Sequence, residues 1–246
     1  MTAAVFWAPH ANFTVGEQVV LEGAEGHHGA TVRRLRVGER AVLTDGQGTR
    51  ADSVVTEVGH DRLVLAVQSV RVDPPPSPRL VVVQALPKGD RGETAVETLT
   101  EVGVDVIVPW SAARCVTQWR DQRGAKALAR WRSTAREAAK QSRRGTWPQV
   151  ADLAGTAQVA ALLAAATLGA VLHEAADAAL AGVSVPAYGD VVVVVGPEGG
   201  LDDTELATFL QRGALAYRLG DSVLRTSTAG TVAAAVLLAR TRRWAD

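Results

Sequence analysis

Hydrophobic and polar residues follow two different patterns along this chain of 246 residues, and the pattern changes near residue 75. Before that point, short runs rich in valine and leucine are separated by turns that contain glycine; they read QVVL, RAVLTD, ADSVVTEV and RLVLAVQSVRV. Short strands at regular spacing are typical of a β-barrel or sandwich. Residues 1–72 are therefore predicted to form a small β domain.

The segment DPPPSP, residues 73–78, marks the change of pattern. Consecutive prolines have no N–H to donate to a sheet and favour a stiff, extended linker. After it, continuous apolar runs alternate with segments of helical propensity; the runs are LVVVQAL (80–86), VDVIVPW (104–110) and DVVVVV (190–195). Such runs are typical of parallel strands that are buried on both faces. Residues 79–246 are predicted to form an α/β domain with a mostly parallel sheet.

Shorter elements complete this second domain. Strands are predicted at 169–174 and 216–219, and the helices are predicted to end near Gly103, to fill most of 114–144, to cover 153–166 and 202–212, and to follow a cap at Ser227 or Thr228. Residues 153–172 carry no charge, but the stretch is dominated by alanine and interrupted by glycine. We interpret it as a soluble helix that runs into a strand, rather than as a membrane span.

Two loops that follow predicted strands are candidates for a ligand site. The first is GPEGG (196–200), whose glycines let backbone N–H groups approach a ligand, and Asp202 or Asp203 is expected to cap the next helix with Glu205 in its first turn. The patterns of phosphate-binding and dinucleotide-binding loops are absent, so a nucleotide phosphate is not the expected ligand. A simple tight turn is the alternative interpretation.

The second loop is LGDSVLRTSTA (219–229). Leu219, Leu224 and the backbone of Gly220 suit an apolar slot for an adenine ring, whereas the alternative is a plain strand-to-helix loop with a solvated Arg225. The carboxyl ends of parallel strands lie at one edge of the sheet, where ligands bind in open α/β folds. Both loops are therefore expected to line one pocket.

Charge is distributed locally, because 26 basic residues balance 26 acidic ones over the whole chain. Residues 114–144 hold ten Lys and Arg against two acidic residues, with Trp119 and Trp131 between them and Trp147 shortly after. Cations neutralise phosphates and indoles stack on unpaired bases, so this pattern favours RNA binding over a plain solvated helix. A second basic cluster comprises His27, His28, Arg33, Arg34, Arg36 and Arg40.

Other features limit the possible functions. A single cysteine, Cys115, excludes an internal disulfide and a cysteine-based metal site and fits a reducing cytoplasm, and no metal is expected. The N-terminus has no pattern of a signal peptide. The loop PKGDRGE (87–93) is a weak candidate for anion binding, and a lone histidine such as His173 at a strand end is more often structural than catalytic.

Several blocks occur together in this chain: GPEGG with its acidic helix start, LG–VLR–TA, ALPKGDR, RW–REAAKQSRR–PQV and the N-terminal HH–VRRLRVGE–DGQG. In this combination they resemble the ribosomal RNA uracil-N3 methyltransferases, the RsmE family of the SPOUT superfamily. The resemblance implies a PUA-like β-barrel for RNA binding at 1–72, a linker at 73–78, and at 79–246 a methyltransferase domain with a deep trefoil knot. It also implies S-adenosylmethionine as cofactor, a homodimer, a cytoplasmic location, and 16S rRNA or the 30S subunit as substrate.

The resemblance carries expectations for individual residues. Arg225 is expected to stabilise the developing uracil anion and Glu198 to accept the N3 proton. The expected cofactor contacts are Leu172, His173, Glu174, Gly196, Pro197, Gly199, Gly200, Leu219, Gly220, Leu224 and Thr226. The expected RNA contacts are Arg33, Arg34, Arg36, Lys88, Arg91, Arg132, Arg136, Lys140, Arg143 and Arg144.

This chain departs from the family pattern at Ser227, where the family commonly has glutamate, and at Asp221 and Ser222, where it often has a basic residue. Two alternatives stay open from the sequence. One is a SPOUT methyltransferase that acts on another position in rRNA or tRNA. The other is a ribosome assembly factor that binds RNA without catalysis.

Overall fold

The computed structural model describes residues 3–245, which divide into two compact units. The first unit comprises Met1–Pro75 together with Ala139–Trp147, and the second comprises Pro76–Ala138 and Pro148–Asp246. The sequence pattern had placed residues 139–147 with the second domain. The first unit is therefore built from two separate stretches of chain.

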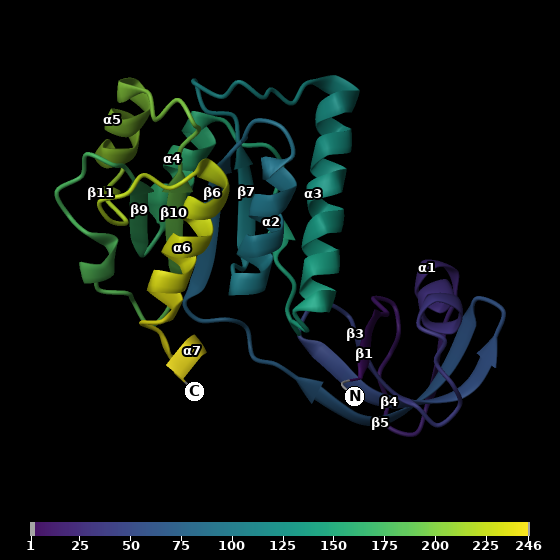
Figure 1. Cartoon of the computed structure of the whole chain (residues 1–246). Helices are drawn as coiled ribbons and strands as arrows, with labels where there is room; N and C mark the ends of the chain where they lie inside the picture. The colour runs from purple at the N-terminus through teal and green to yellow at the C-terminus, as the bar shows by residue number, and fades with distance from the viewer. Residues whose placement is uncertain (1–2, 246) are drawn as a thin grey trace. The chain divides into compact units, whose positions relative to one another are not determined.

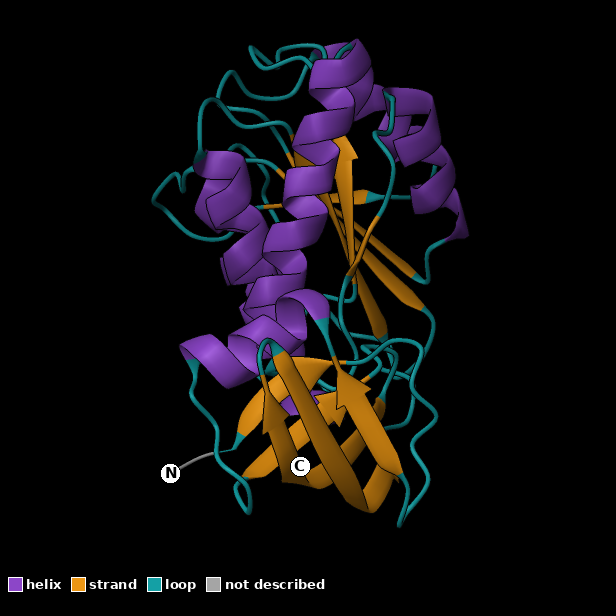
Figure 2. Ribbon diagram, turned by 90° about the vertical axis from the view of Figure 1, so that its right-hand side faces the viewer, coloured by secondary structure: helices purple, strands orange, loops and turns teal. Residues whose placement is uncertain are grey.

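The first unit is a curved five-stranded sheet in the order β1-β3-β4-β5-β2 (Figure 2). Its elements are β1 (Ala4–Trp7), β2 (Gln18–Leu21), α1 (Gly23–His27), the π-helix η1 (His28–Val32), β3 (Arg40–Thr44), β4 (Thr49–Gly59) and β5 (Arg62–Val72). Buried and exposed positions alternate along β2 and most of β4, so one face supplies a core around Phe6, Leu43, Leu63 and Leu65. The four predicted strands are confirmed as β2 to β5, whereas β1, α1 and η1 were not predicted.

Residues 145–147 complete the first unit at the turn between β3 and β4. Gln47 and Thr146 form an antiparallel bridge, and the N–H of Trp147 donates to the carbonyl of Gly46 at 2.9 Å. The indole of Trp147 lies over Gly46, where a Cβ would come within 2.9 Å of the ring, and packs against Trp7 with ring centroids 5.5 Å apart. A glycine at residue 46 is needed for this close approach.

The second unit contains a six-stranded parallel sheet in the order β11-β9-β10-β6-β7-β8. Its strands are β6 (Arg79–Ala85), β7 (Val106–Trp110), β8 (Gln149–Val150), β9 (Leu168–Leu172), β10 (Asp190–Val195) and β11 (Leu215–Tyr217). The valines of β10 are almost completely buried, as expected for a central strand covered on both faces. The predicted parallel α/β architecture is confirmed.

Helices cover both faces of this sheet (Figure 1). The helical elements are α2 (Arg91–Val102), α3 (Asp121–Gln141), α4 (Thr156–Ala165), the 3-10 turn η2 (Leu180–Gly182), α5 (Asp203–Gln211), α6 (Thr226–Leu238) and α7 (Arg242–Ala245). Helices α2 and α6 pack on each other and α6 packs on β6 and β10, whereas α4 packs on α5, β9 and β10. Gly230 lets α6 lie close to the sheet, because a Cβ there would meet Leu99, Val195 and Val82 at 3.2 to 3.3 Å.

One helix start differs from the sequence-based prediction, whereas the interpretation of residues 153–172 as a helix followed by a strand is confirmed. The last long helix begins at Thr226 with Arg225 as its N-cap residue, because the carbonyl of Arg225 already accepts the N–H groups of Thr228 and Ala229 at 2.9 Å. The uncharged stretch 153–172 contains α4 and β9, and within residues 3–245 we find no helix with the length and apolar character to cross a membrane.

Candidate functional site

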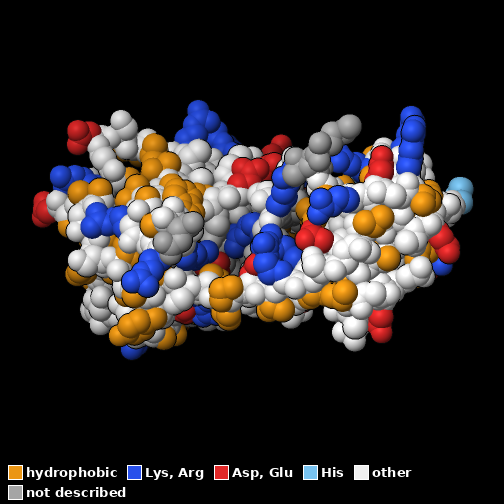
Figure 3. Space-filling view, turned by 90° about the horizontal axis from the view of Figure 1, so that it is seen from below, with side chains coloured by type: hydrophobic (Ala, Val, Ile, Leu, Met, Phe, Trp, Pro, Cys, Tyr) orange, Lys and Arg blue, Asp and Glu red, His pale blue; other side chains and the backbone are white. Residues whose placement is uncertain are grey.

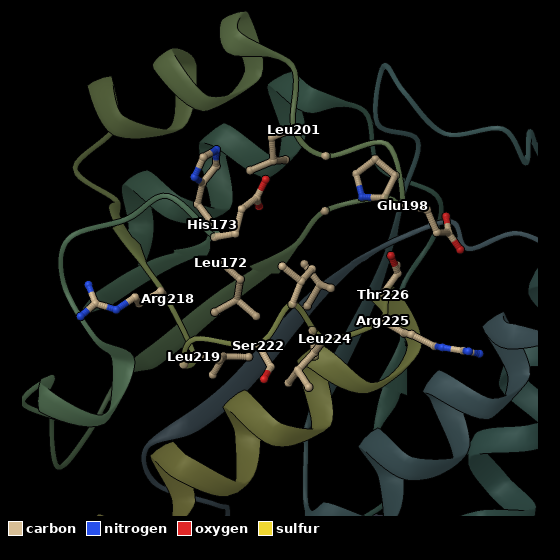
Figure 4. Close-up of a pocket in the computed structure, with 18 of the residues that line it drawn as sticks. Leu172, His173, Glu198, Leu201, Arg218, Leu219, Ser222, Leu224, Arg225 and Thr226 are labelled. Atoms are coloured by element: carbon tan, nitrogen blue, oxygen red, sulfur yellow. The ribbon is translucent and has the colours of Figure 1, made fainter.

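The carboxyl ends of β9, β10 and β11 lie beside one another and open into a cavity of about 380 Å³ (Figure 4). Three loops line it, one after each strand, and Arg91 at the start of α2 adds to the rim. The lining residues are Arg91, Leu172, His173, Glu174, Val195, Gly196, Pro197, Glu198, Gly200, Leu201, Tyr217, Arg218, Leu219, Gly220, Asp221, Ser222, Val223, Leu224, Arg225, Thr226 and Ala229. The predicted meeting of the two loops at one edge of the sheet is observed.

The loop after β9 is fixed to the end of β11. The N–H of His173 donates to the carbonyl of Tyr217 at 2.9 Å, and Ala179 forms a parallel bridge with Arg218. The guanidinium of Arg218 donates to the carbonyls of Ala176 and Asp177. Arg218 therefore holds the backbone of this loop.

The glycine loop, residues 196–200, turns sharply between β10 and α5. The N–H of Gly200 donates to the carbonyl of Pro197 at 2.9 Å, and Gly200 has a φ of +73°, which favours glycine. Asp202 then caps α5, since its side chain accepts the N–H of Thr204 at 2.9 Å. Hydrogen bonds from the backbone and from the side chain of Thr204 lower the pKa of the Asp202 carboxyl from its ordinary value. The capping motif predicted for Asp202 or Asp203 with Glu205 is confirmed at Asp202.

The third loop, residues 219–225, is more exposed. Asp221, Ser222 and Val223 are largely open to solvent, and Leu224 is half-buried. The start of α6 that follows is held by Gln84 of β6, whose fully buried carboxamide donates to the carbonyl of Thr226 at 3.2 Å. The helix start is therefore fixed while the loop before it is open.

Glu198 and Arg225 both extend to one side of the cavity, away from Leu172 and Leu219 (Figure 4). The Oε1 of Glu198 accepts the backbone N–H of Lys88 at 3.1 Å and lies 3.8 Å from Nη1 of Arg91. The guanidinium of Arg225 is exposed and has no hydrogen bond or ion pair with any residue from 3 to 245. It is thus a cation at the rim that is free to meet a ligand.

Most residues predicted to contact a cofactor lie at this cavity, although Gly199 does not line it. Four further lining residues lie outside the predicted loops: Val195, Leu201, Tyr217 and Arg218. Four others lie within the predicted loop 219–229 but were not named individually as contacts: Asp221, Ser222, Val223 and Ala229. Val195, Tyr217 and Arg218 directly precede the predicted loop residues, so the strand ends were the signal that could have found them. The lining by Asp221, Ser222 and Val223 shows that the third loop contributes along its whole length.

The residues predicted to contact RNA have different environments. Arg33, Arg34, Arg36 and Arg143 are exposed. Arg132 donates to Asp152 at 2.9 Å, and Arg136 lies 4.0 Å from Glu137. Arg144 donates to the carbonyl of Thr146 at 3.0 Å. Lys88 and Arg91 lie beside Glu198, as described above.

Two residues of the basic segment have structural contacts. The Lys140 side chain is only 12% exposed and its Nζ lies 2.7 Å from Oε1 of Glu25, within the first unit. Trp131 is 2% exposed, packs edge-to-face on Trp119 and lies over Gly92. The expectation that Trp131 stacks on RNA bases is therefore wrong, because its ring belongs to the core of the second unit.

Figure 3 shows Lys and Arg side chains in several groups on the face seen from below, with Asp and Glu among them. This mixture agrees with a net charge of +0 and a balanced composition. An anionic partner is therefore attracted by individual clusters of cations rather than by a uniform positive surface.

Comparison with family models assigns both parts of the chain. Residues 74–238 match the model of an RNA methyltransferase domain, and residues 21–68 match that of an RNA methyltransferase PUA domain. The first match spans about two thirds of the chain and includes every strand and loop of the cavity.

Known proteins resemble the chain over its length. Ribosomal RNA small subunit methyltransferase E from Mycobacterium bovis is 43% identical over 99% of this chain and 94% of its own sequence. A methyltransferase from Legionella pneumophila, solved with SAM bound, superposes with a TM-score of 0.87 at 27% identity over 98% of this chain and 99% of that one. Ribosomal RNA small subunit methyltransferase E from Neisseria gonorrhoeae, bound to S-adenosyl methionine, gives a TM-score of 0.86 at 28% identity over 97% and 98%.

Proposed function

The chain belongs to the RNA methyltransferase family that includes ribosomal RNA small subunit methyltransferase E, and we propose that it transfers a methyl group from S-adenosylmethionine to N3 of a uridine in 16S rRNA of the small ribosomal subunit. The observation that carries this proposal is the cavity at the ends of β9, β10 and β11, with the unpaired guanidinium of Arg225 at its rim. The similarity to proteins solved with S-adenosylmethionine supports the choice of cofactor.

The lining of the cavity fits S-adenosylmethionine. A volume of about 380 Å³ lies within the range of small-molecule pockets. Leu172, Leu219 and Leu224 offer an apolar surface for an adenine ring, and the carboxylates of Glu174 and Asp221 suit a ligand that carries a sulfonium cation. When bound, S-adenosylmethionine supplies an electrophilic methyl group. The cofactor contacts expected from the sequence form part of this proposal.

Arg225 is proposed to stabilise negative charge on the uracil. Methylation at N3 forms a nitrogen–carbon bond, breaks the sulfur–carbon bond and releases the N3 proton. As that proton leaves, charge builds up on the ring and its carbonyl oxygens, and a positioned guanidinium lowers the barrier. Arg225 suits this role because it has no partner within the described chain that would have to be displaced.

Glu198 is proposed to accept the N3 proton. Its Oε1 is engaged by the N–H of Lys88 and faces Arg91, which fixes the direction of the carboxylate. Its Oε2 has no such contact among residues 3–245, so it can accept a proton from a base placed between Glu198 and Arg225.

RNA phosphates are proposed to bind the cations named from the sequence. Exposed arginines such as Arg143 are the best candidates, because an exposed guanidinium exchanges only water and counterions for a phosphate. Lys140 is the weakest candidate, since its ammonium already pairs with Glu25. Replacing Arg143 with glutamine is expected to reduce the salt slope of RNA binding by about one. Fluorescence anisotropy over a series of salt concentrations measures this slope.

Three broader features complete the proposal. A homodimer is supported by the family resemblance and by the exposed apolar side chains Leu215 and Val223 on the second unit. The trefoil knot is supported by a sheet order that puts β10, from late in the chain, beside β6, with β9 on the other side of β10. A cytoplasmic location follows from the proposed substrate. Light scattering of the purified protein tests the proposed homodimer, and the mass of a monomer would contradict it.

The central experiment supplies labelled S-adenosylmethionine together with either 30S subunits or free 16S rRNA. Mass spectrometry of nuclease fragments then maps the modified base. We expect label on N3 of a uridine. Label on another atom of 16S rRNA would contradict methylation at N3 of a uridine, and lack of label with both substrates would favour an RNA-binding protein without catalysis. Arg225→Ala serves as the matched inactive control.

A further inference from the structure

Arg114 contacts the glycine loop from outside the cavity. It lies in the segment between β7 and α3, and its Nη1 donates to the carbonyl of Gly199 at 3.3 Å. Its Nη2 lies 3.9 Å from Oδ2 of Asp202. A Cβ built on Gly199 would lie 3.4 Å from the Cβ of Arg114, so the arginine packs directly on the glycine backbone.

A buried carboxylate ties the same two segments together at a second point. Glu205 of α5 is 5% exposed, and its Oε1 accepts the N–H of Ala113 at 2.8 Å and the hydroxyl of Thr156 at 3.0 Å. Its Oε2 accepts the N–H of Asp202 at 3.4 Å. The backbone next to Arg114 is thereby fixed relative to the end of the glycine loop.

These contacts determine the orientation of one peptide group. The carbonyl of Gly199 and the N–H of Gly200 belong to the same planar unit, so they move together. The N–H donates to Pro197 inside the turn, and the carbonyl accepts from Arg114 outside it. Glu198 and Gly200, on either side of Gly199, both line the cavity. Arg114 thus acts on the cavity wall without lining it.

We propose that Arg114 is a positioning residue for the cofactor: it holds the peptide between Gly199 and Gly200 in the orientation that S-adenosylmethionine binding requires. The inference rests on the proposed function, because it concerns the cofactor site of that enzyme. Glycines around the turn leave the backbone free to rotate, and an external hydrogen bond from a charged donor opposes that rotation.

The test compares Arg114→Gln with Arg114→Lys and with Arg212→Gln. Arg212 is an exposed arginine that follows α5, so its replacement changes the net charge by the same amount without touching the loop. Isothermal titration calorimetry gives the affinity for S-adenosylmethionine, and steady-state assays with 16S rRNA give KM for each substrate and kcat. Thermal unfolding of each variant without ligand reports stability.

For Arg114→Gln we expect the Kd and KM for S-adenosylmethionine to rise about fivefold to tenfold, with kcat and the KM for RNA changed less than about twofold. Lysine, which also donates from a cation, should restore part of the affinity, and Arg212→Gln should match the wild type. Unchanged cofactor affinity, a rise confined to the KM for RNA, or an equal loss in Arg212→Gln would each overturn the inference. Absence of S-adenosylmethionine binding by the wild type would instead overturn the proposed function, and this inference with it.

Discussion

The glycine loop and the loop from Leu219 to Arg225 line the same cavity but are held in different ways. The glycine loop accepts hydrogen bonds from Lys88 and Arg114 and leads into the capped start of α5. The loop from Leu219 to Arg225 exposes most of its residues. The guanidinium of Arg225, at its end, has no partner in the described chain. Gln84 fixes only the helix start that follows.

This difference suggests a division of roles within one site. A backbone that is fixed by neighbouring segments provides a constant shape for a cofactor, whereas an open loop with a free cation can meet a large substrate and respond to developing charge. Substitutions at and around the two loops test this division of roles.

The largest effect is expected at Arg225. Arg225→Ala should lower kcat about 100-fold to 1,000-fold, because the cation that stabilises the uracil anion is lost. The affinity for S-adenosylmethionine, measured by calorimetry, should stay the same within about twofold, as the side chain lies at the rim. Normal turnover of the variant would show that Arg225 does not stabilise the uracil anion. A large loss of affinity for S-adenosylmethionine would assign Arg225 to cofactor binding instead.

The next effect is expected at Glu205, which ties the glycine loop to its neighbours. Glu205→Ala should lower the free energy of unfolding in urea by about 3 kcal/mol, because it leaves the N–H groups of Ala113 and Asp202 and the hydroxyl of Thr156 without their acceptor. Glu205→Gln keeps an acceptor oxygen and should cost about 1 kcal/mol. Equal stability of Glu205→Ala and wild type would show that these contacts do not fix the loop.

A matched pair of glycines compares the two loops directly. Gly200→Ala should lower the free energy of unfolding by about 1 kcal/mol, because alanine is strained at the φ of +73° observed there. Gly220→Ala in the other loop should change it by less than about 0.5 kcal/mol, since its φ is not in the left-handed region and its Cβ would meet no atom within 4 Å. Equal costs in urea unfolding would mean that the two loops do not differ in backbone restraint.

The smallest effect concerns acid and Asp202. Hydrogen bonds from Thr204 lower the pKa of its carboxyl below the ordinary 3.8, so its stabilising contribution is complete above that value and is lost as pH falls through the lower folded-state pKa. Asp202→Asn keeps an oxygen for the cap but cannot titrate. Its unfolding temperature should therefore fall less steeply below about pH 4 than that of the Asp203→Asn control, which keeps the titrating cap. If the unfolding temperatures of the two variants fall equally with pH, the carboxyl of Asp202 is not the source of the stability lost in acid.

Much of the fold could be predicted because the patterns are local. Continuous valine runs indicate central parallel strands, and glycine or aspartate at their ends indicates loops and caps. The four residues of β1 were missed because their assignment depends on parallel pairing with β3, which is remote in sequence. Trp131 was misread because a tryptophan on a helix has the same sequence signal whether it packs inside or stacks on a base.

The site was predictable to the level of its loops. Strand ends placed residues 172–174, 196–200 and 219–226 at one edge, since parallel strands share it. The contacts of Arg114, Glu205 and Gln84 could not be predicted. Each joins two segments that are far apart in the sequence, and no local pattern indicates that these segments meet. Those contacts are what distinguish the fixed loop from the open one.

The first unit is built from two separate stretches of chain, and this has a consequence for its synthesis on the ribosome. Its strands are complete at Val72, but Trp147 and the bridge between Thr146 and Gln47 come from a segment about seventy residues later. A nascent chain that ends in the proline-rich linker therefore lacks a side chain that covers Gly46 and Trp7. Domains commonly fold in order as they emerge, from the N-terminus onward. Here the first unit reaches its final packing only after α2, β7 and α3 have also been translated.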